Sequence, residues 1–159
     1  MSKFLLISTL AWLLVACSGI EVVTHTSSFY DMETECLGKN MDGLQTLRVW
    51  ATGNDKNDAL KQAQKKAVYE VVFNGISAGA GECNAYPVVD EPNARKEYED
   101  YFDRFFSDSG NYKKYVNIAN KDKDAMSAYK SGGRIQFSII VIVDRAGLRK
   151  QFKNDGIIK

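Results

Sequence analysis

The stretch RIQFSIIVIV at residues 134–143 decides the fold of this chain. Its odd-numbered positions are all apolar, while its even-numbered positions begin polar and become isoleucine at Ile140 and Ile142. This alternation predicts a β-strand with one buried face, and the apolar second half predicts cover on both faces. We therefore expect a central strand here, followed by a short helix over 145–154 that ends near Gly156.

A second strong strand is predicted over Leu44–Gly53, where apolar residues alternate with polar ones. Trp50 falls on the face opposite Leu47, Val49 and Ala51. A weaker strand over 32–37 precedes it, and the intervening residues 39–43 end in Asp-Gly, which is a good turn signal. These features predict a β-hairpin.

Two longer helices are predicted in the middle of the chain. Over 58–74, apolar residues recur at helical spacing opposite a lysine-rich face, with Asp55 or Asn57 as the cap and Gly75 as the stop. The second helix runs from Pro92 to about Phe106 and carries an aromatic stripe typical of a helix that covers a sheet. That stripe consists of Tyr98, Tyr101, Phe102 and Phe105.

The connecting segments are less regular. Residues 75–89 are predicted to form a long loop, because they contain three glycines and a proline. Two weak strands are predicted over 112–119 and 126–130, joined by a charged turn at 120–124.

Together these elements predict an α+β fold. We expect an antiparallel or mixed sheet of about four to five strands, packed with two longer helices and a short C-terminal helix. The alternative is a small α/β sandwich, if the strands at 44–53 and 134–143 run parallel as neighbours. With 159 residues, of which 45% are hydrophobic and 26% charged, the chain has the composition of one folded domain.

The N-terminus has the pattern of an export signal. A single lysine, Lys3, precedes an apolar run that ends Leu14-Val15-Ala16-Cys17. This motif resembles the lipobox of bacterial lipoproteins, which implies cleavage before Cys17 and attachment of lipid to its sulfur. The alternatives are an ordinary secretory signal and a buried N-terminal helix.

The lipobox resemblance also implies a domain plan and a location. Residues 1–16 are the predicted signal peptide, 17–28 a lipidated tether and 29–159 a single α+β domain. Ser18 after the modified cysteine implies sorting to the cell outer membrane, and we expect the domain to face the periplasm. Without its signal peptide the chain has no net charge, so the lipid on Cys17 is expected to carry the membrane attachment.

Two further cysteines, Cys36 and Cys83, remain after such processing. An even pair in an oxidising compartment predicts one disulfide. In the chain-entropy model a loop of this length gives about 4 kcal/mol of stability. The alternative is two buried free thiols.

A second resemblance covers residues 44–76. A strand ending in Gly53, followed by a helix with alanines at 59, 63 and 67, is similar to modules of small envelope lipoproteins and flagellar-associated lipoproteins. The whole chain also resembles uncharacterised lipoproteins of gut-type Gram-negative bacteria. Neither resemblance implies catalytic residues, and nothing in the pattern is specific to flagella.

The sequence offers little for catalysis. Its one histidine, His25, lies in the predicted tether, so we expect no histidine-based catalytic site and no zinc site. The glycine-rich run at 75–81 follows a helix instead of a strand and has no Gly-Lys-Ser/Thr ending, unlike a phosphate-binding loop. The acids of the second helix are expected to form a solvated face. No cofactor or metal is predicted, and the net charge of +1 favours no nucleic-acid partner.

The prediction is therefore a non-catalytic, lipid-anchored envelope protein that binds another protein or helps to assemble an envelope complex. Trp50, Ile140 and Ile142 are the candidate interaction surface, for an envelope protein or a second copy, and the alternative is that the aromatic helix covers them as core. A different functional class, a small-ligand or glycan-binding lipoprotein, would use the 75–89 loop and the aromatic helix.

Overall fold

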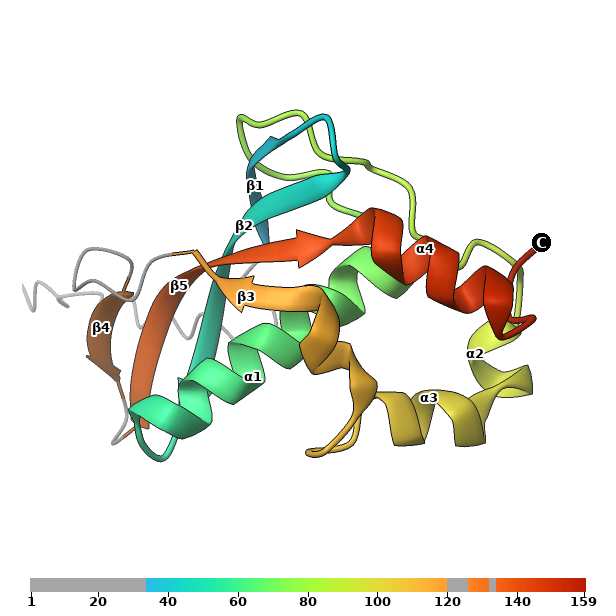
Figure 1. The fold of residues 1–159 in the computed structure, drawn as a ribbon. Helices are drawn as coiled ribbons and strands as arrows, with labels where there is room; N and C mark the ends of the chain where they lie inside the picture. The colour runs from blue at the N-terminus through green and yellow to red at the C-terminus, as the bar shows by residue number, and fades with distance from the viewer. Residues whose placement is uncertain (1–33, 120–125, 132–133) are drawn as a thin grey trace, which may run out of the picture.

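The computed structural model describes residues 34–119, 126–131 and 134–159 (Figure 1). The predicted signal peptide, the predicted lipidation site Cys17 and the predicted tether lie outside this range. The described elements, in chain order, are β1 (Glu35–Lys39), β2 (Leu44–Gly53), α1 (Lys56–Tyr69), a π-helical turn (Glu70–Asn74), α2 (Ala94–Glu97), α3 (Glu99–Phe105), a 3₁₀ turn (Asn111–Tyr115), β3 (Val116–Ile118), β4 (Met126–Ser131), β5 (Arg134–Asp144) and α4 (Arg145–Asn154).

One antiparallel sheet contains all the described strands. Its order is β1-β2-β5, and the far edge of β5 is shared by β3 and β4. β3 pairs with residues 141–143 of β5, and β4 pairs with residues 134–139. The α+β prediction is thus confirmed.

β2 and β5 form the centre of the sheet, where ten residue pairs match in an unbroken antiparallel register from Leu44↔Asp144 to Gly53↔Ile135. The parallel arrangement, and with it the α/β sandwich, is therefore wrong. The central position of β5 agrees with its near-continuous apolar sequence.

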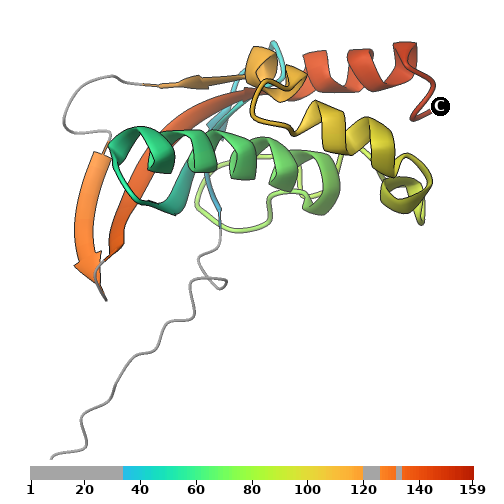
Figure 2. The same ribbon diagram turned by 90° about the horizontal axis from the view of Figure 1, so that it is seen from below.

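Helix α1 covers one face of the sheet (Figure 2). Asp55 caps it by accepting a hydrogen bond from the Asp58 amide at 2.9 Å. Its buried stripe begins with three alanines, whose small side chains allow close approach to the strands. Gly53 makes the turn into α1 possible, because a Cβ there would lie 2.3 Å from the backbone nitrogen of Ala59. The helix widens into the π-helical turn and ends at Gly75, as predicted.

The predicted aromatic helix is the main correction to the sequence analysis. It begins at Ala94 instead of Pro92, and it is broken at Tyr98, whose backbone leaves the helical region at φ −109° and ψ 34°. The break orients α3 toward α4, so that the rings of Phe102 and Phe105 lie 5.8 and 5.3 Å from the ring of Phe152. The packing of these rings against Phe152 has outweighed the preference for one continuous helix through Tyr98.

A second correction concerns residues 112–119. The sequence predicts a strand there, but a 3₁₀ turn at Asn111–Tyr115 comes first and β3 is only three residues long. Tyr112 is 1% exposed and its ring lies 6.1 Å from that of Phe106. Burying this ring requires the turn, which shortens the strand.

Candidate interaction surface

The candidate surface is the face of β2 and β5 opposite α1, here called the open face. Leu47, Val49, Ile139 and Val141 point toward α1 and are completely buried. The alternate residues point the other way and are only half-buried, because no described helix covers them fully. The open-face residues of the two central strands are Thr46, Arg48, Trp50, Thr52, Ser138, Ile140 and Ile142.

The three predicted residues, Trp50, Ile140 and Ile142, all lie on this face and are absent from the buried core. The aromatic helix does not cover them, because α3 packs against α4 instead. Among the described residues, Ile140 and Ile142 are half-buried, whereas Ile139 and Val141 on the α1 side of β5 are completely buried. The register places Ile140 diagonally to Trp50, within reach of its indole ring, because Ser138 is the direct partner of Trp50.

Charged and polar residues accompany the apolar ones. Arg48 stands directly opposite Ile140, and its guanidinium donates to Glu35 of β1 at 3.0 Å. Both side chains of this ion pair are more than one-third exposed, so the pair contributes little to stability. Thr46 faces Ile142 across the strand pair. An apolar centre with an arginine beside it has the composition of a protein-binding surface.

The predicted disulfide is confirmed. Cys36 of β1 is joined to Cys83 of the 75–89 loop, with their Cα atoms 5.8 Å apart. The bond fixes this loop along the outer edge of β1 (Figure 1). Sequence analysis missed the exposed apolar residues near this margin, Met41 in the hairpin turn and the 80% exposed Tyr86 in the loop. Their exposure depends on loop packing, which leaves no periodic signal.

The buried Arg145 is another residue that the sequence did not single out. It is 9% exposed, and its guanidinium donates to the backbone oxygens of Tyr86 and Pro87 at 3.0 and 3.3 Å. Burial lowers its pKa, opposed by the charge of Asp90. By binding these two carbonyls, the buried Arg145 holds the end of the 75–89 loop against α4.

A small cleft lies at the aromatic end of the molecule, away from the open face. It has a volume of about 220 Å³ and is lined by Tyr101, Arg104, Phe105, Asn111 and Asp155. The Tyr101 hydroxyl donates to the Asp155 carboxylate at 2.5 Å, and Gln151 donates to the same oxygen at 2.7 Å. Burial, with this hydrogen bond and the negative charge, raises the pKa of Tyr101 above its usual range. Pockets for ordinary ligands are larger, about 300–1,000 Å³, so this cleft fits a single side chain or a small group.

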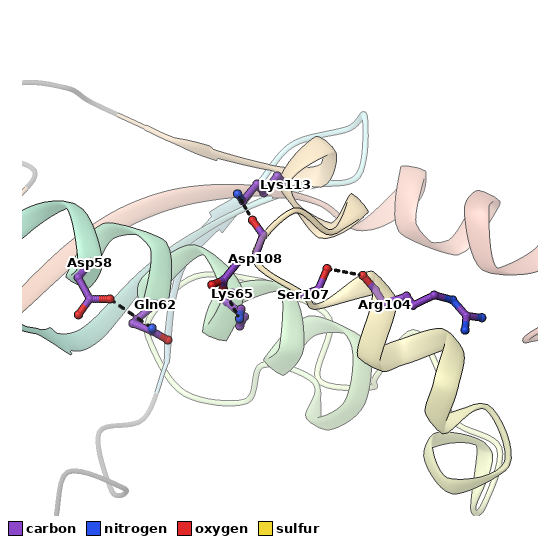
Figure 3. Close-up of polar contacts among 7 residues, drawn as sticks. All are labelled: Asp58, Gln62, Lys65, Arg104, Ser107, Asp108 and Lys113. Carbon is purple, nitrogen blue, oxygen red and sulfur yellow. Dashed lines mark hydrogen bonds and ion pairs between the residues drawn. The ribbon is translucent and has the colours of Figure 1, made fainter.

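Polar contacts between α1 and the segment after α3 are shown in Figure 3. Lys65 forms an ion pair with Asp108 at 3.2 Å, and Lys113 donates to the Asp108 backbone oxygen. The Asp108 side chain is 98% exposed, and the Arg104 guanidinium points away from these contacts (Figure 3). The Lys65–Asp108 ion pair attaches the segment after α3 to α1.

The acidic side chains of α2 and α3 lie on the surface of the molecule. Glu97, Glu99, Asp100 and Asp103 are all exposed on α2 and α3, as a solvated face requires. No group of three or more histidine, cysteine, aspartate or glutamate residues in the described part of the chain is placed to hold a metal ion. Within the same residues, no helix is both long enough and apolar enough to span a membrane.

Comparison with models of known protein families, with curated proteins and with solved structures found no match.

Proposed function

We propose that this is a non-catalytic, lipid-anchored envelope protein that binds another protein through the open face of its sheet. The observation that carries the proposal is the position of Trp50, Ile140 and Ile142: they are apolar, half-buried and on the face that the core does not use. Tryptophan and arginine dominate the energetics of protein interfaces, and Arg48 lies among these residues. The lipid anchor rests on the lipobox resemblance at Cys17.

The test of the surface is Trp50→Ala. Crosslinking in native cells first identifies the partner, and the affinity of the purified pair is then measured. If Trp50 is an interface anchor that contributes about 2 kcal/mol, its removal weakens binding about 30-fold. Thr52→Ala, on the same face of the same strand, is the matched control and should leave binding within about twofold.

Two results would contradict the proposal that the open face binds a partner. One is an unchanged affinity for Trp50→Ala. The other is a loss of several kcal/mol of unfolding free energy with binding intact, which would place Trp50 in the core. The anchor is tested separately by mass spectrometry of the mature N-terminus, where a free, unmodified Cys17 or an intact Met1 would exclude lipidation.

The small-ligand or glycan-binding function remains the second candidate, and the cleft at Tyr101 is the observation in its favour. An aromatic ring pair beside Arg104 and Asn111 provides stacking and hydrogen-bonding groups. The cleft ranks second because of its small volume and because it lies away from the 75–89 loop that the sequence favoured. Titration of the protein with amino sugars, followed by the tyrosine resonances in NMR spectra, would detect such binding. Tyr101→Ala should abolish it.

A further inference from the structure

The loop at 75–89 occupies the place of a neighbouring strand along the outer edge of β1. The Cys36 amide donates to the Ala78 carbonyl at 2.8 Å, and the Gly81 amide donates to the Cys36 carbonyl at 3.1 Å. Glu35 and Ala78 are also bridged as in a parallel ladder. Both backbone groups of Cys36 that face away from β2 are therefore satisfied by the loop.

This close approach depends on two glycines. At Gly79, where φ is +104°, a Cβ would lie 2.4 Å from the Cys36 carbonyl oxygen and 2.6 Å from its amide nitrogen. At Gly81 a Cβ would lie 2.5 Å from the Gly38 amide nitrogen. The contacted atoms belong to the backbone, which cannot move aside as a side chain can. A side chain at either position would push the loop off the strand.

Backbone hydrogen bonds at both ends of the loop, together with the disulfide, hold the loop in place. At the start of the loop the Gly75 amide donates to the carbonyl of Glu70 at 2.8 Å, and at its end the amides of Val88 and Val89 donate to the carbonyls of Val71 and Val72 at 3.0 and 2.9 Å. Between these points, the disulfide to Cys83 is the covalent link between the loop and β1.

We propose that this loop is a disulfide-locked guard of the β1 edge, and that the uncovered edge binds β1 of a second copy. An uncovered edge strand presents unpaired amides and carbonyls, which is a template for pairing with another chain. In an antiparallel pair, one residue exchanges both of its backbone groups with its partner, and Cys36 directs both groups outward. A two-fold contact between identical strands follows directly from that geometry.

The charges of β1 favour the antiparallel alignment. The strand begins with Glu35 and ends with Lys39. With Cys36 of one copy opposite Cys36 of the other, Glu35 lies opposite Leu37 and diagonal to Lys39 of the second copy, whereas parallel copies bring like charges together. Leu37, which is 38% exposed between them, adds apolar surface to the contact.

Formation of the Cys36–Cys83 disulfide, which locks the loop, is an oxidation. It removes two protons and two electrons from the thiols of Cys36 and Cys83, and an oxidant of the disulfide class takes them up as it becomes a dithiol. The edge is thus available before oxidation and blocked afterwards.

The decisive variant is Gly79→Ala, which displaces the loop and leaves both cysteines in place. The full-length protein in detergent is examined by native mass spectrometry over a concentration series, with hydrogen exchange at the Cys36 amide as the measure of cover. We expect at least a tenfold rise in dimer formation, and a Cys36 amide that exchanges fast in the monomer and slowly in the dimer. Gly38→Ala is the matched control on the same strand, because a Cβ there meets nothing within 4 Å.

Wild-type protein reduced with a dithiol provides the second test and serves alone if Gly79→Ala does not fold. It should dimerise as the variant does, while the oxidised wild type stays monomeric. An uncovered Cys36 amide without dimers would overturn the proposal, as would an amide that stays protected both in the variant and after reduction. Adding Leu37→Lys to the variant should weaken the dimer at least tenfold, because a charge on an edge strand opposes pairing.

This contact is separate from the open face. Trp50→Ala in the Gly79→Ala background should leave the β1 dimer unchanged, so each proposal can fail without the other. If Trp50→Ala abolished the dimer, the copies would be meeting through the open face and the guarded-edge proposal would be wrong.

Discussion

The two faces of β2 and β5 are built from alternate residues of the same strands, yet their surroundings differ. Toward α1, Leu47 and Ile139 have no exposed surface. On the open face, Trp50 and Ile140 are only half-buried. The strand pattern alone could not distinguish these faces over the second half of β5, where both carry β-branched apolar residues. The position of one helix separates core from candidate interface.

The largest effect that tests this comparison comes from two adjacent isoleucines. Ile139→Ala should lower the free energy of unfolding by about 2–5 kcal/mol, because it leaves a cavity under α1. Ile140→Ala makes the same chemical change on the open face and should cost about 1 kcal/mol or less, since water already reaches that side chain. Urea denaturation of both variants measures the difference, and equal losses would mean that the open face is also core.

An intermediate effect is expected from Gln45, the polar exception on the α1 side of the sheet. It is 1% exposed, and neither its amide nitrogen nor its amide oxygen has a hydrogen-bond partner among the described residues. Gln45→Met keeps the length of the side chain and removes the buried amide, so it should raise the free energy of unfolding by about 1–3 kcal/mol. A destabilised variant in thermal denaturation would show that the amide is satisfied in solution.

The smallest effect is expected from the ion pair on the open face. A double-mutant cycle on Glu35→Ala and Arg48→Ala should give a coupling of about 0.2–1 kcal/mol, because both side chains are substantially exposed. The coupling should fall when salt is raised to 1 M. A coupling well above this range, or one that salt does not change, would indicate that the open face is shielded from water.

Much of the fold could be predicted from local patterns. The strand at Leu44–Gly53 and the helix at Arg145–Asn154 match the predicted boundaries, and the central strand exceeds its predicted end by one residue. The disulfide could also be predicted, because the lipobox resemblance sets Cys17 apart and leaves Cys36 and Cys83 as one possible pair. The candidate residues Trp50, Ile140 and Ile142 could be placed on one face, since period-two alternation fixes the direction of each side chain.

The sequence by itself determined which residues form the strands and which of them share a face, because alternation and turn residues are local properties. Only the tertiary structure decided which face of the sheet is covered by helices and which stays open. Aromatic packing with Phe152 drew α3 away from the sheet and left the open face without its expected cover. The loop that carries Gly79 lies against Cys36 of β1, which is 43 residues earlier in the sequence. Such contacts join segments distant in sequence, and no short-range pattern encodes them.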